Sequence, residues 1–138
     1  MKRESKKPPP DRSAIMRAVP GRDTSAELKV RRLLRPMAPG YRLHRKDIPG
    51  NPDIAFVAAK KAIFVHGCFW HGHDCRRGAR MPKTNVDYWR AKIGRNRARD
   101  ARHLEELTTR GWRALVVWEC ELADEAALER RLCAFVCD

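Results

Sequence analysis

The segment from His66 to Cys75 holds two cysteines, three histidines and two large aromatic residues in ten positions. Cys68, His73 and Cys75 have a C-x4-H-x-C spacing that can supply three ligands to one Zn2+. A structural zinc site usually has four nitrogen or sulfur ligands. Spacing alone does not decide between His71 and His73. Any one of these residues is more often an ordinary buried or surface residue, but the cluster predicts a zinc site.

The fourth zinc ligand must come from another part of the chain. Cys120 is the best candidate, because the apolar run from Ala114 to Val117 could return it to the loop at the end of a strand. Cys133 and Cys137 are possible substitutes. They stand four residues apart on one face of an expected helix, so buried packing is the default expectation for both.

A second group of residues suits a harder metal ion. Asp53 opens an expected strand after Pro52, and the adjoining strand ends at Val65-His66, so a hairpin could bring Asp53 and His66 together. Mg2+ prefers carboxylate and carbonyl oxygens and keeps several waters. A histidine beside such a water can accept its proton or stabilise a leaving oxygen. Pro-Asp is common where strands and turns begin, so this prediction depends on the neighbouring histidines.

The elements that must position these groups follow from periodicity and capping signals. Thr24-x-x-Glu27 is a capping-box spacing, and the apolar positions after it predict a helix that ends before Pro39-Gly40. A second helix is expected over 87–110, and a last one carries Leu128, Leu132 and Phe135 on one face. Strands are expected over 41–44, 53–57, 62–65 and 112–118. The order αβββαβα predicts a mixed sheet flanked by helices.

Composition favours one small domain that binds a polyanion. The 138 residues carry 30 Lys and Arg against 17 Asp and Glu, a net charge of +13, and nucleic acid is the first candidate partner. We expect residues 1–12 to be a flexible, basic, proline-rich tail and residues 13–138 to form the domain. No apolar run reaches transmembrane length and no signal peptide is recognisable, so we expect a cytoplasmic protein without a membrane partner. Five cysteines, two of them in a metal-like pattern, fit reduced thiols in that compartment.

Six short motifs together resemble the very short patch repair (Vsr) endonucleases, which nick DNA beside T:G mismatches. The resemblance runs from about Arg12 to Cys137, and the combination is highly specific although each motif is short. The motifs are Met16-Arg17-Ala18, Arg22-Asp23-Thr24-x-x-Glu27, Pro49-Gly50-x-Pro52-Asp53, His66-Gly67-Cys68-Phe69-Trp70-His71, Lys92-Ile93-Gly94-x-Asn96-x-x-x-Asp100 and Val117-Trp118-Glu119-Cys120.

The resemblance implies a restriction-endonuclease-like fold, a mixed sheet flanked by helices, with a zinc-stabilised loop. In this family histidine chemistry replaces the usual carboxylate and lysine of the second active-site strand. The present chain agrees, because that strand reads Phe64-Val65-His66 without an acid-x-lysine triplet. A threonine commonly precedes His-Gly-Cys in the family, where this chain has Val65. We expect the backbone carbonyl to be the metal ligand there, which valine supplies equally well.

Roles for the polar residues follow from the same resemblance. Asp53 and the Val65 carbonyl would bind Mg2+, His71 would be the general base, and His66 would contact the scissile phosphate or a metal-bound water. Glu27 and Asp100 would form an outer layer around the waters of the metal. Glu27 could instead be only a capping-box residue, and Asp100 could pair with a neighbouring arginine. The resemblance assigns four residues to Zn2+, namely Cys68, His73, Cys75 and Cys120.

The remaining implications concern DNA. A mismatch resists unstacking less than a matched pair, and by resemblance Phe69 and Trp70 intercalate beside it, with help from Trp89 and from Met16 in the other groove. Asn96 and the arginines between Arg90 and Arg102 are further expected DNA contacts. The implied product is a nick 5' to the mismatched thymine, made by a monomer in the bacterial cytoplasm, at the nucleoid. Implied functional partners are a cytosine-5 methyltransferase, a repair polymerase and a ligase. The alternatives are a related nuclease with another mismatch or duplex specificity, and a mismatch-binding module without catalysis.

Overall fold

A computed structural model describes residues 24–75 and 81–137. The helices and strands follow in the predicted order, so the expected αβββαβα arrangement is confirmed. The expected tail, the domain boundary at residue 13 and Met16 lie outside the described residues. The elements are α2 (Ser25–Leu34), β1 (Arg42–Leu43), β2 (Ile54–Phe56), β3 (Lys61–His66), α4 (Val86–Thr109), β4 (Arg113–Trp118), a 3-10 helix (Glu119–Ala123) and α5 (Glu125–Val136).

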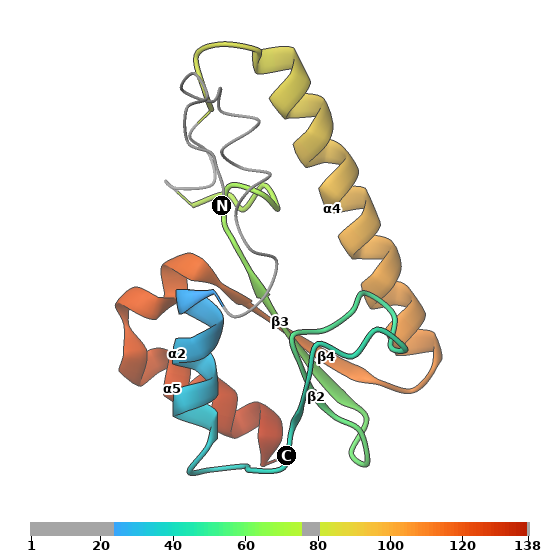
Figure 1. Ribbon diagram of the computed structural model, residues 1–138, viewed down its shortest axis with the longest axis vertical. Coiled ribbons are helices and arrows are strands. Elements are labelled where there is room, and N and C mark those ends of the chain that lie inside the picture. The colour runs from blue at the N-terminus through green and yellow to red at the C-terminus, as the bar shows by residue number, and fades with distance from the viewer. Residues whose placement is uncertain (1–23, 76–80, 138) are drawn as a thin grey trace, which may run out of the picture.

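The four strands form one mixed sheet in the order β1-β2-β3-β4. β1 pairs with β2 and β2 with β3 in antiparallel fashion, whereas β3 and β4 are parallel, with Lys61 opposite Arg113 and His66 opposite Trp118. Parallel neighbours need a long crossover, and α4 lies within it. In Figure 1, α2 and α5 lie side by side on one side of the sheet and α4 runs along the other. The predicted mixed sheet flanked by helices is confirmed.

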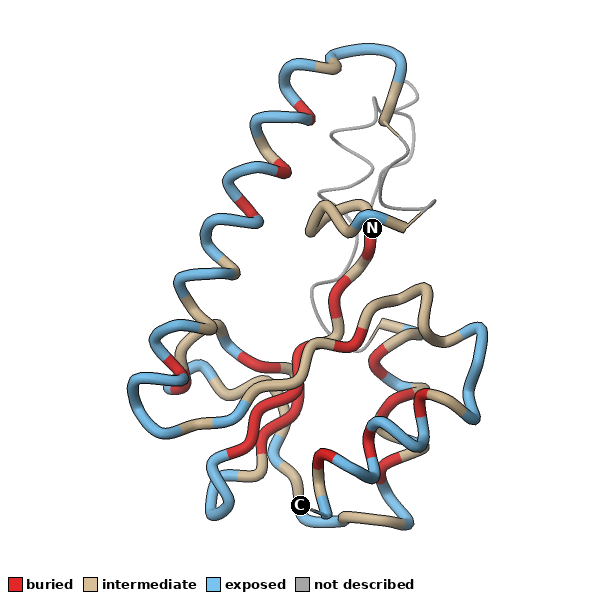
Figure 2. Tube along the Cα trace, turned by 180° about the vertical axis from the view of Figure 1, so that it is seen from behind, coloured by how far each residue is buried: buried red, intermediate tan, exposed pale blue. Residues whose placement is uncertain are grey.

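Both faces of the sheet are covered by apolar cores. Because side chains alternate along a strand, Ile63 points to one face and its neighbours Ala62 and Phe64 to the other. The first core joins the sheet to α2 and α5 through Val30, Leu34, Ile54, Ile63, Val117, Leu128, Leu132 and Phe135. The second core, under the C-terminal half of α4, contains Ile48, Ala55, Ala62, Phe64 and Leu107. Figure 2 shows the result: the central strands are largely buried and α4 is exposed over most of its circumference.

Local sequence explains where the first elements begin and end. The Thr24 hydroxyl accepts a hydrogen bond from the backbone N–H of Glu27 at 3.2 Å, which is the expected N-cap of α2. β1 is shorter than expected, because His44 has a φ of +49° and so leaves the extended conformation. Its amide still donates to the carbonyl of Asp53 at 3.1 Å, so the chain stays beside β2.

The expected burial of Cys133 and Cys137 is wrong. Both are exposed near the C-terminal end of α5, with their sulfurs 3.6 Å apart. The face of α5 that packs on the sheet carries Leu128, Leu132 and Phe135. Cys133 lies about 100° around the helix from Leu132 and therefore points away from that face. Within the described residues, no helix is long and apolar enough to cross a membrane.

The buried Lys61 ammonium caps the C-terminus of α5. Lys61 is 6% exposed, and Nζ donates to the carbonyls of Phe135 at 2.8 Å and Val136 at 3.3 Å. Lys61→Met keeps the apolar length but removes these donors, so we expect it to lower the free energy of unfolding by about 2 kcal/mol. Urea denaturation measures this change. Lys60→Met, at the neighbouring exposed position, is the control, and equal effects of the two substitutions would contradict the capping role.

Candidate active site and metal centres

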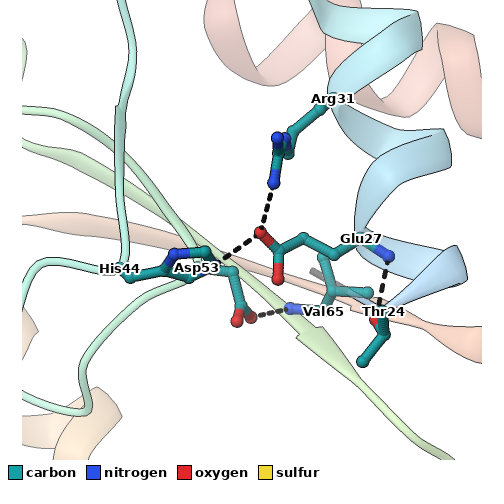
Figure 3. Close-up of polar contacts among 6 residues, drawn as sticks. All are labelled: Thr24, Glu27, Arg31, His44, Asp53 and Val65. Atoms are coloured by element: carbon teal, nitrogen blue, oxygen red, sulfur yellow. Dashed lines mark hydrogen bonds and ion pairs between the residues drawn. The ribbon is translucent and has the colours of Figure 1, made fainter. Parts of the chain in front are cut away.

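The β2–β3 hairpin brings Asp53 against the end of β3. The backbone N–H of Val65 donates to Asp53 Oδ2 at 2.7 Å, which fixes the carboxylate beside the strand (Figure 3). A cavity of about 370 Å³ opens here. It gathers five of the predicted site residues, Asp53, Val65, His66, His71 and Asp100, and is also lined by Gly50, Asn51, Phe64, Arg99, His103 and Leu104.

Asp53 has the properties of a cation ligand. Burial raises the pKa of its carboxyl to about 6, although the hydrogen bond from Val65 opposes the shift and the nearby Glu27 adds to it. A carboxylate that is both desolvated and next to a second carboxylate is destabilised as an anion. A divalent ion between the two would relieve this cost, so the oxygen-rich donor set fits a hard ion.

His71 and Asp100 form an oriented pair that also lines the cavity. His71 Nδ1 lies 2.5 Å from Asp100 Oδ2. Burial raises the pKa of Asp100, but the hydrogen bond from His71 and the nearby charges outweigh it, so that the pKa is lowered overall. Asp100 is therefore an acceptor, and His71 donates from Nδ1. This leaves Nε2 with a lone pair, which is the arrangement of a general base held by a carboxylate.

His66 is stacked on His71 and is held neutral. The two rings are 3.7 Å apart between centroids and 2° from parallel. Burial, followed by the charge of His71, lowers the pKa of His66 to about 4. Its buried Nδ1 has no hydrogen-bond partner among residues 24–75 and 81–137, and an unsatisfied buried polar atom at a cavity is a sign of a missing ligand.

Glu27 does more than begin α2. Its side chain is almost fully buried, and Oε2 accepts from Arg31 Nη1 at 3.0 Å and lies 2.7 Å from His44 Nε2 (Figure 3). The alternative considered for Asp100, that it only pairs with a neighbouring arginine, also does not describe the structure. The Asp100 carboxylate contacts His71 and, at 3.9 Å, Arg99. Both carboxylates are thus directed toward the site.

The sequence interpretation missed His44 and His103, and it expected Arg99 to contact DNA without placing it in the cavity. His44 lies beside Glu27 and Asp53, and the other two line the cavity. No local sequence signal marked His44, because its position opposite Asp53 follows from the register that pairs Leu43 with Ile54. Arg99 and His103 lie on the same side of α4 as Asp100 at helical spacing, which periodicity could have indicated.

The four predicted zinc ligands lie together. One ligand atom from each of Cys68, His73, Cys75 and Cys120 falls within 4.8 Å of the others. Cys120 Sγ is 3.6 Å from His73 Nδ1, close to the spacing of about 3.6–3.8 Å between two ligands of a tetrahedral zinc ion. Because β3 and β4 are parallel, both strands end on the same side of the molecule, with His66 opposite Trp118. Cys120, which follows β4, is therefore brought close to the loop that follows β3. His71 points instead to Asp100, so the geometry separates the two histidines.

The aromatic residues of the loop have different exposures. Phe69 and Trp70 are half-buried, whereas Trp89 is 1% exposed and lies beneath them, with ring centroids at 5.5 Å from Phe69 and 6.2 Å from Trp70. The Asn96 side chain is buried and donates to the carbonyl of Trp70 at 2.9 Å. Trp89 and Asn96 thus support the loop from α4.

Together, the sheet with its flanking helices, the acidic residue of the β2–β3 hairpin and the adjoining histidines define an endonuclease of the restriction-endonuclease-like class. The fold is similar to a solved catalytic domain of the homing endonuclease I-Bth0305I, with a TM-score of 0.55 and 25% identity over 81% of this chain and 93% of that one. Residues 6–77 match the family model described as DNA mismatch endonuclease Vsr. The chain belongs to this family.

Two relatives that match most of this chain agree with this assignment. The type II nicking enzyme V.XorIIP of Xanthomonas oryzae pv. oryzae is 52% identical over 124 residues, which cover 90% of each chain. The DNA mismatch endonuclease Vsr of Escherichia coli K12 is 41% identical over 125 residues, covering 86% of this chain and 80% of the relative. The predicted family and the predicted endonuclease class are confirmed.

Proposed function

We propose that this endonuclease nicks one DNA strand 5' to the thymine of a T:G mismatch by Mg2+-dependent hydrolysis, as in very short patch repair. The observation that carries the proposal is the cavity that Asp53 shares with an imidazole oriented by Asp100. A hydrolytic nuclease needs these two functions on opposite sides of a phosphate: a site for a cation and a base for a water. The family assignment supplies the mismatch substrate.

Each residue of the cavity has a distinct task. Asp53 and the Val65 carbonyl would hold Mg2+, which when bound neutralises charge that develops on the phosphoryl oxygens. His71 takes a proton from the attacking water at Nε2, and Asp100 stabilises the resulting imidazolium. The neutral His66 hydrogen-bonds to the scissile phosphate, and Glu27 holds the outer layer of the site beside Asp53.

The proposed task of Asp100 predicts a large effect of one substitution. Asp100→Asn keeps the shape but removes the charge that orients His71, so we expect the single-turnover nicking rate to fall by about a hundredfold to ten-thousandfold. DNA binding should be retained, because Asp100 is not a DNA contact. Asp87→Asn, which changes an exposed carboxylate on the same helix, is the control. A normal rate with Asn at position 100 would contradict the assignment.

The loop from His66 to Cys75 would recognise the mismatch. Zn2+ on Cys68, His73, Cys75 and Cys120 would order the loop, and Phe69 and Trp70 would insert between base pairs while Trp89 and Asn96 support them. We infer that Met16 inserts from the other groove. Phosphate contacts come from α4, whose arginines at 90, 95, 97, 99 and 102 are all exposed.

We further infer the cellular setting from the family and the reaction. The protein is a monomer with a single nuclease domain and acts on the nucleoid in the bacterial cytoplasm. Deamination of a 5-methylcytosine made by a cytosine-5 methyltransferase supplies the T:G pair, and a polymerase and a ligase must complete the repair of the nick.

Cleavage of defined duplexes tests the proposed substrate. End-labelled duplexes with a T:G mismatch, another mismatch or a T:A pair are incubated with Mg2+ or EDTA, beside an Asp53→Ala variant. We expect a nick only at the mismatched thymine, only with Mg2+ and only with Asp53 present. Equal cutting of another mismatch or of matched duplex would favour a related nuclease with a different specificity. Binding without cutting would indicate a mismatch-binding module without catalysis.

A further inference from the structure

Three side chains from separate elements meet beside the cavity. Glu27 comes from α2, His44 follows β1 and Asp53 precedes β2, and one ligand atom of each lies within 4.8 Å of the other two. Figure 3 shows the Glu27 carboxylate directed at His44, with Asp53 beside the imidazole. Two carboxylates and one imidazole therefore converge on a single point, as ligands of one ion do.

The distances fit adjacent ligands of one metal ion. His44 Nε2 and Glu27 Oε2 are 2.7 Å apart. Two neighbouring ligands of an octahedral ion with bonds of 2.0–2.1 Å stand about 3 Å apart, so only a small adjustment separates the observed pair from a chelating one. Binding by His44 would thus bring Glu27 from the outer layer of the site into direct contact with the ion. Arg31 anchors the same carboxylate oxygen at 3.0 Å and Val65 anchors Asp53, so the oxygen ligands are already oriented.

The backbone of His44 is adapted to this position. A φ of +49° is uncommon for a residue with a side chain, and such conformations concentrate at functional sites. The left-handed turn ends β1 at Leu43 and leaves His44 beside Asp53, to whose carbonyl its amide donates. The hydrogen bond secures the backbone of His44, and the ring extends to Glu27.

We propose that His44 binds the divalent ion at Asp53 through Nε2 and shifts the preference of the site from Mg2+ toward Co2+ and Mn2+. This inference rests on the proposed function, which places the ion at Asp53. Oxygen ligands suit Mg2+, whereas an imidazole nitrogen favours the first-row transition ions, whose affinities rise along the series from Mn2+ to Co2+ and beyond. His44 thus determines metal selectivity and does not act on the phosphate.

Metal binding by the zinc-loaded protein tests the proposal without a cleavage assay. Titration calorimetry compares Co2+ with Mg2+, and pulsed electron paramagnetic resonance of bound Mn2+ detects a coordinated nitrogen. His44→Gln can still donate to Glu27 but has no imidazole. We expect it to weaken Co2+ binding by at least about tenfold, to change Mg2+ binding much less and to remove the nitrogen signal that is due to His44. His103→Gln is the control, because His103 lines the cavity but is not one of the three converging side chains, Glu27, His44 and Asp53. This variant should keep the affinities for Co2+ and for Mg2+.

The other outcomes are distinguishable. Equal losses of Co2+ and Mg2+ binding in His44→Gln would reduce His44 to a residue that orients Glu27 and would overturn the proposal. An unchanged nitrogen signal would do the same. Asp53→Ala should lose both ions. If it does and His44→Gln binds both ions normally, only the inference about His44 fails, whereas normal binding by Asp53→Ala would overturn the metal site of the proposed function itself.

Discussion

Asp53→Asn is expected to abolish Mg2+-dependent nicking and yet to stabilise the Mg2+-free protein at neutral pH. Asparagine can still accept the hydrogen bond from Val65 but is a poor ligand for a hard cation. A catalytic metal contributes several kcal/mol to the transition state, so nicking of a T:G duplex should fall by at least about a thousandfold. An ordinary structural role of Asp53 would instead lower activity and stability together.

The stability gain follows from the pKa of Asp53. Burial raises this pKa to about 6, whereas a carboxyl group of the unfolded chain has a pKa of about 3.9. The folded protein therefore binds this proton more tightly than the unfolded chain does. Stability from this group is fully present below pH 4 and is lost as the pH rises through 6. Asparagine does not ionise, so the Asp53→Asn variant does not lose this stability as the pH rises.

Urea denaturation without added Mg2+ measures this effect. At pH 7 the asparagine variant should be more stable than the parent protein by about 2–3 kcal/mol, and near pH 4 the two should converge. Glu27→Gln, which alters the neighbouring carboxylate, is a useful comparison. A variant that is less stable than the parent at pH 7 would show that Asp53 is not strained as an anion in the fold.

Cys120→Ser is expected to release the proposed zinc ion of the loop and to destabilise the whole domain. Cys120 joins the loop to the end of β4, and its N–H donates to Cys68 Sγ at 3.4 Å. A bound structural zinc ion contributes many kcal/mol to folding, so the midpoint of thermal unfolding should fall by at least about 10 °C. Nicking should fall as well, because His71 lies within the same loop.

Zinc content after purification and thermal denaturation are the measurements. Cys133→Ser removes an exposed thiol that lies outside the ligand set, and it should retain one equivalent of zinc and the parental midpoint. If Cys120→Ser also kept its zinc, the fourth ligand would have to be another residue.

Much of the fold could be predicted because its signals are local. The capping residue Thr24, the apolar stripe of the last helix and the apolar run before Cys120 each act within a few residues, and each marks an element that the structure contains. The clustering of cysteines and histidines in one loop had the same advantage. Family resemblance then extended the prediction to site roles for Glu27 and Asp100, which local patterns describe only as a capping-box residue and a helix carboxylate.

Features that depend on how distant segments pack were missed. His44 gains its position from the register of β1 against β2, and the two-residue length of β1 gave no periodicity to read. Trp89 has helical spacing with the buried Ile93 and Asn96 of α4, but its position under Phe69 and Trp70 depends on how the loop packs against this helix. The exposure of Cys133 is different, because it could have been read from the predicted face of Leu128, Leu132 and Phe135, from which Cys133 is rotated by about 100° relative to Leu132.

The parallel pairing of β3 with β4 has a consequence for the order of folding. Cys68 and Cys120 are separated by 52 residues, and α4 lies between them. Contacts of such long range form late, because the intervening chain must first lose its conformational entropy. The hairpin of β2 and β3 is local and can form early, so Asp53 meets Val65 before Cys120, the fourth of the proposed zinc ligands, arrives. Metal capture by the complete four-residue set should therefore be among the last steps of folding, and the rate at which the metal is bound would report the docking of β4.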